Sequence, residues 1–174
     1  PVPVSDANGF VNGSVKQISA GGDHTCAVTT DDSVYCWGQN YDGYLGNGNT
    51  NKSSVPVKVV NGAEGFVNGS VREVSAGVYN TCAVTTHGAA YCWGWNAQGQ
   101  LGNGNTADSS VPVRVSDANG FVNGSVEQIS AGGTDDNGNG HMCAVTTASG
   151  GNTVYCWGSN ENGQLGDGTN AQSS

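Results

Sequence analysis

The chain has 174 residues, and its 5 basic and 14 acidic residues give a net charge of −9, with only 11% of residues charged. That balance argues against nucleic acid, whose phosphates need a basic footprint, and against an anionic membrane surface. No apolar run approaches the roughly 20 residues that a membrane-spanning helix needs. The sequence begins at Pro1 without a methionine or a signal peptide, so we expect a mature, trimmed or partial product.

The same sequence pattern occurs three times along the chain. It consists of Cys-Ala-Val-Thr-Thr, then Tyr-Cys-Trp-Gly, then Leu-Gly-(Asn/Asp)-Gly. A fixed period of this length indicates a repeat architecture, in which each unit buries its apolar face against its neighbours. We place the three units at residues 1–54, 55–110 and 111–174, the third being longer because of two insertions. Nothing that recurs resembles an active site, so we expect a binding or structural protein and not an enzyme.

Six cysteines form three pairs, one in each unit. The pairs are Cys26 with Cys36, Cys82 with Cys92, and Cys143 with Cys156. No Cys-x-x-Cys occurs, so a zinc ribbon is not expected. Paired cysteines at recurring positions predict one disulfide per unit and an oxidising, extracellular compartment.

Each unit is predicted to contain a β-hairpin. In the middle unit, runs of β-branched and aromatic residues bounded by glycines predict short strands at 71–77, 81–85 and 89–93. If Cys82 and Cys92 lie opposite one another, residues 86–88 form a three-residue hairpin loop with Gly88 in the left-handed position. In the first unit that position falls to Asp32, which tolerates it better than most residues. No segment has helical periodicity, which leaves an all-β chain.

A second hairpin is predicted where Asn-Gly stands between β-formers, at Asn12, Asn68 and Asn123. With it, each unit offers about four short strands, the content of one propeller blade. The sequence therefore predicts three β-propeller blades. The same asparagines begin Asn-Gly-Ser sequons, and Asn51 begins a fourth sequon, so N-glycosylation is the alternative role of these residues. Turn geometry by itself already accounts for the Asn-Gly pairs.

An insertion found only in the third unit contains a partial calcium-loop pattern. Asp135, Asn137 and Asn139 are spaced as in the opening of a Ca²⁺-binding loop and are followed by a glycine. The twelfth position is Thr146 and not glutamate, so the usual bidentate ligand is missing. A polar, glycine-rich surface loop is the alternative, and Ca²⁺ is the only cofactor that the sequence suggests.

Aromatic residues divide into those that recur and those that do not. Tryptophans at 37, 93 and 157 recur and are expected to pack between blades. Non-recurring aromatic residues are better binding candidates, because tryptophan and tyrosine are enriched in binding hot spots. These candidates are Trp95, Tyr79, Tyr41 and Tyr44. Isolated surface aromatic residues with no partner are the alternative.

The histidines do not suggest catalysis. His24 and His141 share one repeat position, which Asn80 occupies in the second unit, and this favours a structural hydrogen bond. His87 is predicted at a hairpin tip. No Ser-His-Asp, Cys-His or paired-carboxylate set can be proposed, and disulfide-bonded cysteines are not nucleophiles.

These residues resemble the regulator of chromosome condensation repeat family. Its Ser-Ala-Gly, His-(Thr/Ser)-Cys-Ala, Val-Tyr-Cys-Trp-Gly and Asn-x-x-Gly-Gln-Leu-Gly segments correspond in the first unit to residues 19–21, 24–27, 34–38 and 40–46. The resemblance covers essentially the whole chain and implies a propeller used for protein binding. The cysteine-paired form looks like the secreted bacterial branch, which includes a β-lactamase inhibitor. The nuclear namesakes exchange nucleotide on a small GTPase and touch chromatin, but nothing here matches their functional loops, and the acidic charge opposes chromatin.

The two ends of the chain are in phase with the repeat. Family propellers usually close with about seven blades, and three blades cannot close a ring. Ser173-Ser174 match the serines at 53–54 and 109–110, whereas Pro1-Val2 align with Pro112-Val113. We expect either part of a longer array or copies joined head to tail. The leading hypothesis is an extracellular protein-binding or scaffold module, and the alternative is a structural subunit of a head-to-tail extracellular filament.

Overall fold

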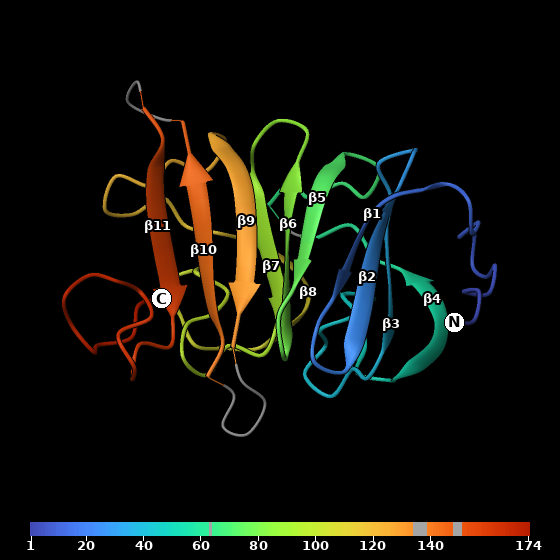
Figure 1. The fold of residues 1–174 in the computed structure, drawn as a ribbon, viewed down its shortest axis with the longest axis horizontal. Helices are drawn as coiled ribbons and strands as arrows, with labels where there is room; N and C mark the ends of the chain where they lie inside the picture. The colour runs from blue at the N-terminus through green and yellow to red at the C-terminus, as the bar shows by residue number, and fades with distance from the viewer. Residues whose placement is uncertain (63, 134–138, 148–150) are drawn as a thin grey trace.

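A computed structural model of the chain describes residues 1–62, 64–133, 139–147 and 151–174. The described residues form three antiparallel sheets that stand side by side in chain order as an open arc, without a closed ring (Figure 1). The first sheet contains β1 (Val15–Ala20), β2 (His24–Thr29), β3 (Val34–Gly38) and β4 (Ser53–Lys58). The second contains β5 (Val71–Ala76), β6 (Asn80–Thr85), β7 (Ala90–Gly94) and β8 (Ser109–Arg114). The third contains β9 (Val126–Gly132), β10 (His141–Thr146) and β11 (Thr153–Gly158). Each sheet is one blade, and the two termini lie at opposite ends of the arc.

The predicted hairpin with its disulfide is confirmed in every blade. The second and third strands of each blade pair so that the two cysteines are direct partners. The disulfides join Cys26 to Cys36, Cys82 to Cys92 and Cys143 to Cys156. In the hairpin loops, Asp32 has a φ of 62° and Gly88 a φ of 75°, as the left-handed position requires.

The second predicted hairpin is wrong. The backbone N–H of Ser70 donates to the carbonyl of Val67 at 3.2 Å, which closes a tight turn, but within the described residues no strand leads directly into this turn. A type I′ turn needs positive φ at both central residues, and here only Gly69, with a φ of 106°, has it. Two Asn-Gly pairs with positive φ at both residues lie earlier in their units: Asn8-Gly9, between the bridged residues Ala7 and Phe10, and Asn119-Gly120, between Ala118 and Phe121.

The fourth strand of a blade comes from Ser-Ser-Val-Pro-Val, which the sequence patterns did not single out. In the first two blades this strand, β4 or β8, lies at the outer edge of its sheet. Pro56 and Pro112 are accommodated there because an edge strand does not need every N–H for pairing. The unit boundaries placed after residues 54 and 110 therefore fall inside β4 and β8. In the third blade the chain makes only an isolated bridge between Gly158 and Ser173 at this position.

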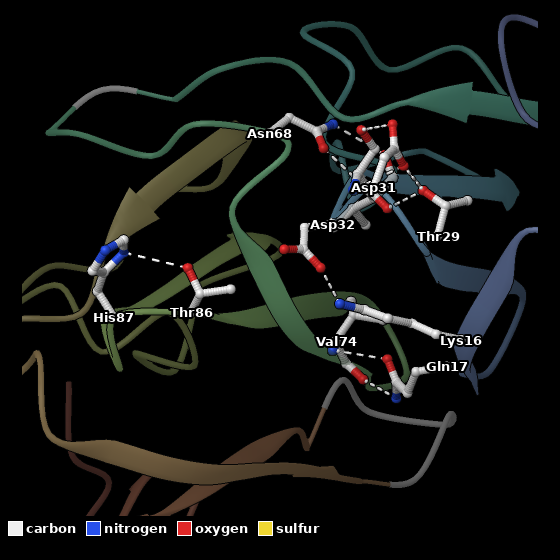
Figure 2. A network of polar contacts seen from close by, with 11 residues as sticks. Lys16, Gln17, Thr29, Asp31, Asp32, Asn68, Val74, Thr86 and His87 are labelled. Carbon is white, nitrogen blue, oxygen red and sulfur yellow. Dashed lines mark hydrogen bonds and ion pairs between the residues drawn. The ribbon is translucent and has the colours of Figure 1, made fainter.

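Side-chain amides of one blade form hydrogen bonds with backbone groups of the neighbouring blade. Gln17 in the first blade accepts from the N–H of Val74 at 3.0 Å and donates to its carbonyl at 2.8 Å (Figure 2). Asn68 of the second blade contacts the backbone N–H and carbonyl of Val34 in the same way, at 2.7 and 3.1 Å. Because such bonds bring two far-apart chain segments together, they set the rotation of one blade against the next.

The apolar core lies between blades. One cluster joins the first and second blades and includes Val34, Cys36, Phe66 and Trp93, all nearly inaccessible to solvent. A second cluster joins the second and third blades and is built from the equivalent positions. Burial of this kind is typical of repeat proteins, in which each unit covers its neighbour. Among the described residues, no helix has the length and apolar character required to cross a bilayer.

Candidate protein-binding face

Three of the four non-recurring aromatic residues are accessible at one end of the sheets. This end, which we call the loop end, carries the β1–β2 and β5–β6 connections and Tyr41, Tyr79 and Trp95. Tyr41 is 74% exposed in the loop that follows β3. The rings of Tyr79 and Trp95 are half-buried and meet edge to face, with centroids 6.3 Å apart. The structure thus brings together two residues that the sequence could only mark as unusual.

Tyr44, the fourth aromatic candidate, is not a surface residue, and that expectation is corrected. It is 1% exposed, with its ring 4.9 Å from that of His24 and 6.2 Å from that of Tyr79. Its carbonyl accepts the Nε1–H of Trp93 at 3.0 Å and the hydroxyl of Thr81 at 2.9 Å. Tyr44 therefore joins the first two blades and supports Tyr79 from behind, and burial raises its pKa to about 12.

The loops that form this face are held by one recurring asparagine, which in the sequence is the first residue of the Asn-x-x-Gly-x-Leu-Gly pattern. In the first blade, the Nδ2 of Asn40 donates to the carbonyls of Asn49 and Asn51, at 2.9 and 3.0 Å, while its Oδ1 accepts from the N–H of Leu45. Asn96 and Asn160 do the same in the other blades. The Asn-x-x-Gly-x-Leu-Gly spacing was the available signal for this loop scaffold.

Three carboxylates lie at the same end of the sheets as the aromatic pair. Burial and, next, the nearby charge of Asp108 raise the pKa of the Asp42 carboxyl. Asp108 itself accepts the backbone N–H of Asn96 at 2.7 Å, directly after Trp95. Asp23 is exposed at the same end and, like Asp42, contributes to raising the pKa of Tyr44. The repulsion between Asp42 and Asp108 favours a positively charged partner at this end.

His24 makes the structural hydrogen bond that its repeat position suggested. Its Nε2 lies 2.7 Å from the hydroxyl of Thr81, whose own proton is donated to the carbonyl of Tyr44. The imidazole must therefore donate, which fixes the neutral Nε2–H tautomer. Burial lowers the pKa of His24 to about 4, and it lowers that of the less buried His141 in the same direction.

The calcium hypothesis cannot be built from the described residues. Asp135 and Asn137 lie outside them. The Oδ1 of Asn139 accepts from the Nε2 of Gln98 at 3.2 Å and lies 3.5 Å from the Oγ of Ser159, so it serves as a hydrogen-bond acceptor for protein groups. Within the described ranges, no group of three or more His, Cys, Asp or Glu residues could hold a metal ion.

Two of the four proposed glycosylation sites are occupied by structural hydrogen bonds. The Nδ2 of Asn68 donates to the carbonyls of Val34 and Val59. Asn123 makes the equivalent bonds and is only 7% exposed. A sugar would have to be attached at this same nitrogen, so N-glycosylation at Asn68 and Asn123 is corrected to a structural role. Asn12 and Asn51 are exposed, and glycosylation there stays a prediction.

Comparison with known proteins finds the same repeat throughout the chain. A family model described as "Regulator of chromosome condensation (RCC1) repeat" matches residues 31–84, 87–134 and 151–174, and a second model of that description matches 15–43 and 71–100. The ultraviolet-B receptor UVR8 of Arabidopsis thaliana is 34% identical over 168 residues, which is 97% of this chain and 34% of the receptor. The human E3 ubiquitin-protein ligase HERC2 is 33% identical over 150 residues, covering 86% of this chain and 3% of the ligase.

Solved structures show the same architecture. The structure of human WBSCR16 superposes with a TM-score of 0.71 at 27% identity, covering 92% of this chain and 36% of that one. Prp20p of Saccharomyces cerevisiae superposes equally well, with a TM-score of 0.71 at 20% identity, over 92% of this chain and 37% of that one. The chain spans about a third of the length of UVR8 and of these two structures. On the family matches and the blade geometry, the chain belongs to the regulator of chromosome condensation (RCC1) repeat family.

Proposed function

We propose that this chain is an extracellular protein-binding module that engages its partner through the loop end. The observation that carries the proposal is the half-buried pair formed by Tyr79 and Trp95, which no other blade repeats. Such a pair offers apolar area with little entropy to lose, because the buried Tyr44 behind it already fixes one ring. Aromatic side chains of this kind are frequent anchors of protein interfaces.

The chemistry around the pair suggests the character of the partner. Asp42 and Asp108 lie close enough for one to raise the pKa of the other. A partner segment with lysine or arginine would relieve that repulsion and could place a cation against the Trp95 ring. We therefore propose a basic protein segment as the ligand. The whole chain, with its net charge of −9, would also attract such a partner over distance.

Relatives support a binding role without identifying the partner. Prp20p is described as having binding properties toward Gsp1p and histones, and yeast RCC1 has been solved bound to Kap60. At 20% and 19% identity these structures show only a shared fold. They support the view that blades of this type can present surfaces to other proteins.

Secretion and the absence of catalysis are part of the proposal. Three disulfides, with no free cysteine in the described residues, support an oxidising compartment and a place in the secreted branch of the family. A groove of ≈ 450 Å³ lies at the C-terminal ends of β1, β5 and β9, which are at the loop end, and it is lined by alanine, glycine and valine residues. The lining of this groove offers no side chain for acid–base or nucleophilic chemistry.

A comparison of two bait proteins tests the loop end. Wild-type chain and a Trp95→Ala variant are immobilised and exposed to the extracellular proteins of the producing organism. At least one protein should be enriched by the wild type and bound about thirty-fold more weakly by the variant, because loss of a hot-spot tryptophan costs about 2 kcal/mol or more.

The matched control is Val122→Ala, which removes an exposed side chain in the turn before β9, at the opposite strand end. It should retain the partner. A partner held equally by the wild type and the Trp95→Ala variant would contradict the assignment of this face.

We also propose, as a second function, that copies of the chain join head to tail in an extracellular filament. The observation that favours it is the open arc, whose first and last blades both expose apolar side chains, Ile18 at 60% and Val154 at 63%. Electron microscopy of concentrated protein should show threads with a regular axial repeat or closed rings. Discrete single particles at every concentration would contradict it.

A further inference from the structure

The contact between the first and second blades is built around one asparagine. Asn68 accepts the N–H of Val34 at 2.7 Å and donates to its carbonyl at 3.1 Å, while also donating to the carbonyl of Val59, which directly follows β4. Asn123 repeats all three bonds between the second and third blades, toward Ala90. An asparagine at this position therefore holds the third strand of the preceding blade.

In the first blade the equivalent asparagine is Asn12, and no preceding blade in the described residues offers it a strand. The Nδ2 of Asn12 donates to the carbonyl of Val4 at 3.1 Å, which is the equivalent of the bond from Asn68 to Val59. Its two other bonds have no counterpart among the described residues. At the far end of the arc, Val154 occupies the position of Val34 and is 63% exposed, whereas Val34 is 0% exposed. Within the described ranges, Asn12, at one end of the molecule, therefore lacks the bonds to a preceding strand, and the strand around Val154, at the other end, has no asparagine bound to it.

In the part of the chain that the structure describes, an apolar side chain and a glutamine also lack their partners, one at each end of the molecule. Val74 and Ile129 face the preceding blade and are 1% and 2% exposed, but Ile18 at the same position of the first blade is 60% exposed. Gln17 binds both backbone groups of Val74. Gln128 is its equivalent in the third blade and is exposed. A blade placed before Ile18 would bury it and would provide a glutamine for its backbone.

The recurring tryptophan also differs between the first blade and the other two. The Nε1–H of Trp157 donates to the carbonyl of Gln100 in the preceding blade at 2.9 Å, and Trp93 makes the equivalent bond. Both rings are buried, whereas Trp37 in the first blade is only half-buried. The carbonyl that would receive its Nε1–H belongs to Gln164, the equivalent of Gln100 in the third blade.

Charge at the two ends is complementary. Arg72 of the second blade forms an ion pair with Glu127 of the third at 3.5 Å. The equivalent of Arg72 in the first blade is Lys16, which is exposed and forms an ion pair with Asp32 of its own blade (Figure 2). Glu127 of one copy and Lys16 of the next would therefore meet with opposite signs.

From these matching ends we propose that the last blade of one copy docks onto the first blade of a second copy, with Val154 bound by Asn12 and with Ile18 and Trp37 buried. We call the surface around Asn12, Ile18 and Trp37 the leading face, and that around Gln128, Val154 and Gln164 the trailing face. This inference rests on the self-assembly proposed above and identifies the surfaces that carry it.

The contact joins unlike faces, so each copy keeps one free face after pairing. The assembly closes as a ring if the rotations at successive contacts add up to one full turn without an axial rise, and otherwise it continues as a filament. In both cases the same set of bonds is used at every blade interface.

Two variants that block opposite ends test the proposal. Ile18→Lys places a charge in the leading face, and Val154→Lys does so in the trailing face, and both side chains are exposed in a single copy. Each variant alone should be monomeric by mass photometry and sedimentation, at concentrations where the wild type assembles. An equimolar mixture should form dimers and nothing larger, because each variant keeps the face that the other lacks.

The control is Val67→Lys. Val67 is 51% exposed, and the same turn position is exposed in all three blades at Val11 and Val122, so it should assemble like the wild type. Intact mass without reduction and near-ultraviolet circular dichroism confirm that each variant has its three disulfides and is folded.

The outcomes separate this inference from the proposals on which it builds. If the wild type assembles but Ile18→Lys and Val154→Lys do so as well, self-assembly stands and these faces are wrong. If the mixture gives no dimers while each variant is monomeric, the contact is not head to tail. A wild type that stays monomeric at all concentrations overturns both this inference and the filament, and leaves the Trp95 binding test unaffected.

Discussion

The middle and third blades carry the same sequence pattern but differ in how well it is buried. Ala90 and Leu101 in the middle blade are inaccessible to solvent. Their equivalents in the third blade, Val154 and Leu165, are 63% exposed and partly exposed. The difference arises because a third blade covers the middle one, whereas nothing in the described chain covers the third. A blade of this family therefore supplies its own hydrogen-bonded hairpin but depends on a neighbour for much of its core.

The largest expected effect comes from removing disulfides in the two blades. Cys82→Ala with Cys92→Ala should lower the free energy of unfolding by about 2–5 kcal/mol, and Cys143→Ala with Cys156→Ala by less. The loops closed are similar, with separations of 10 and 13 residues, so the entropic contributions nearly cancel in the comparison. Urea unfolding of both variants measures the difference, and equal losses would show that the covering blade does not matter.

Acid sensitivity should depend on how deeply a blade buries its histidine. Burial lowers the pKa of His24 to about 4 from an ordinary value of 6.5, so below pH 6.5 the unfolded chain binds a proton that the folded chain does not. Stability should fall as pH drops from about 6.5 to 4, by about 3 kcal/mol in total, and this contribution should not change further below that range.

The matched controls are His24→Asn and His141→Asn, which adopt the residue that the middle blade has at this position as Asn80. The first should flatten the pH dependence between 6.5 and 4. The second should have a smaller effect, since His141 is less buried. A pH profile unchanged in His24→Asn would contradict this assignment.

Two asparagines with the same sequence context should differ in their contribution to stability. Asn68→Ala removes three hydrogen bonds to buried backbone groups and should lower the free energy of unfolding by about 2 kcal/mol. Asn12→Ala should cost less than about 0.5 kcal/mol in dilute protein, where no preceding strand is present. Thermal unfolding measures both, and a large cost for Asn12→Ala in monomeric protein would contradict the comparison.

The smallest effect concerns two valines at one repeat position. Val34→Ala should destabilise the chain by about 1.5 kcal/mol, because the removed methyl groups are fully buried. Val154→Ala should be nearly neutral in the monomer and should weaken assembly at high concentration. Denaturant unfolding at two protein concentrations separates these cases. A cost for Val154→Ala that is independent of concentration would show that the third blade is covered by other means.

Predictions that depended on neighbouring residues were confirmed. The pairing of Cys82 with Cys92 and the left-handed Gly88 follow from a short hairpin whose loop chemistry is written in consecutive residues. The candidate face was predicted less well. Trp95 and Tyr79 were found because they break the repeat, but their edge-to-face contact could not be derived, since it depends on how two turns of the same blade meet in space.

The errors share one cause. Asn68 was assigned to a hairpin or a glycan, and Tyr44 to the surface, because their sequence neighbours allow both. Their actual roles depend on Val34 and Trp93, which belong to other segments and, for each of them, to another blade. Similarly, the Val-Pro-Val segment contains a proline, and only its place at a sheet edge makes it a strand.

The number of blades, the hairpin at the centre of each and the disulfide that closes it could all be predicted from the amino-acid sequence. These features are local, because turn residues and alternating side chains act over a few positions along the chain. The three-dimensional arrangement was needed to learn which side chains are buried, where the fourth strand comes from and which surfaces remain free. Those features depend on the rotation of one blade against the next, which is set by hydrogen bonds and packing between residues more than thirty positions apart, such as Asn68 and Val34.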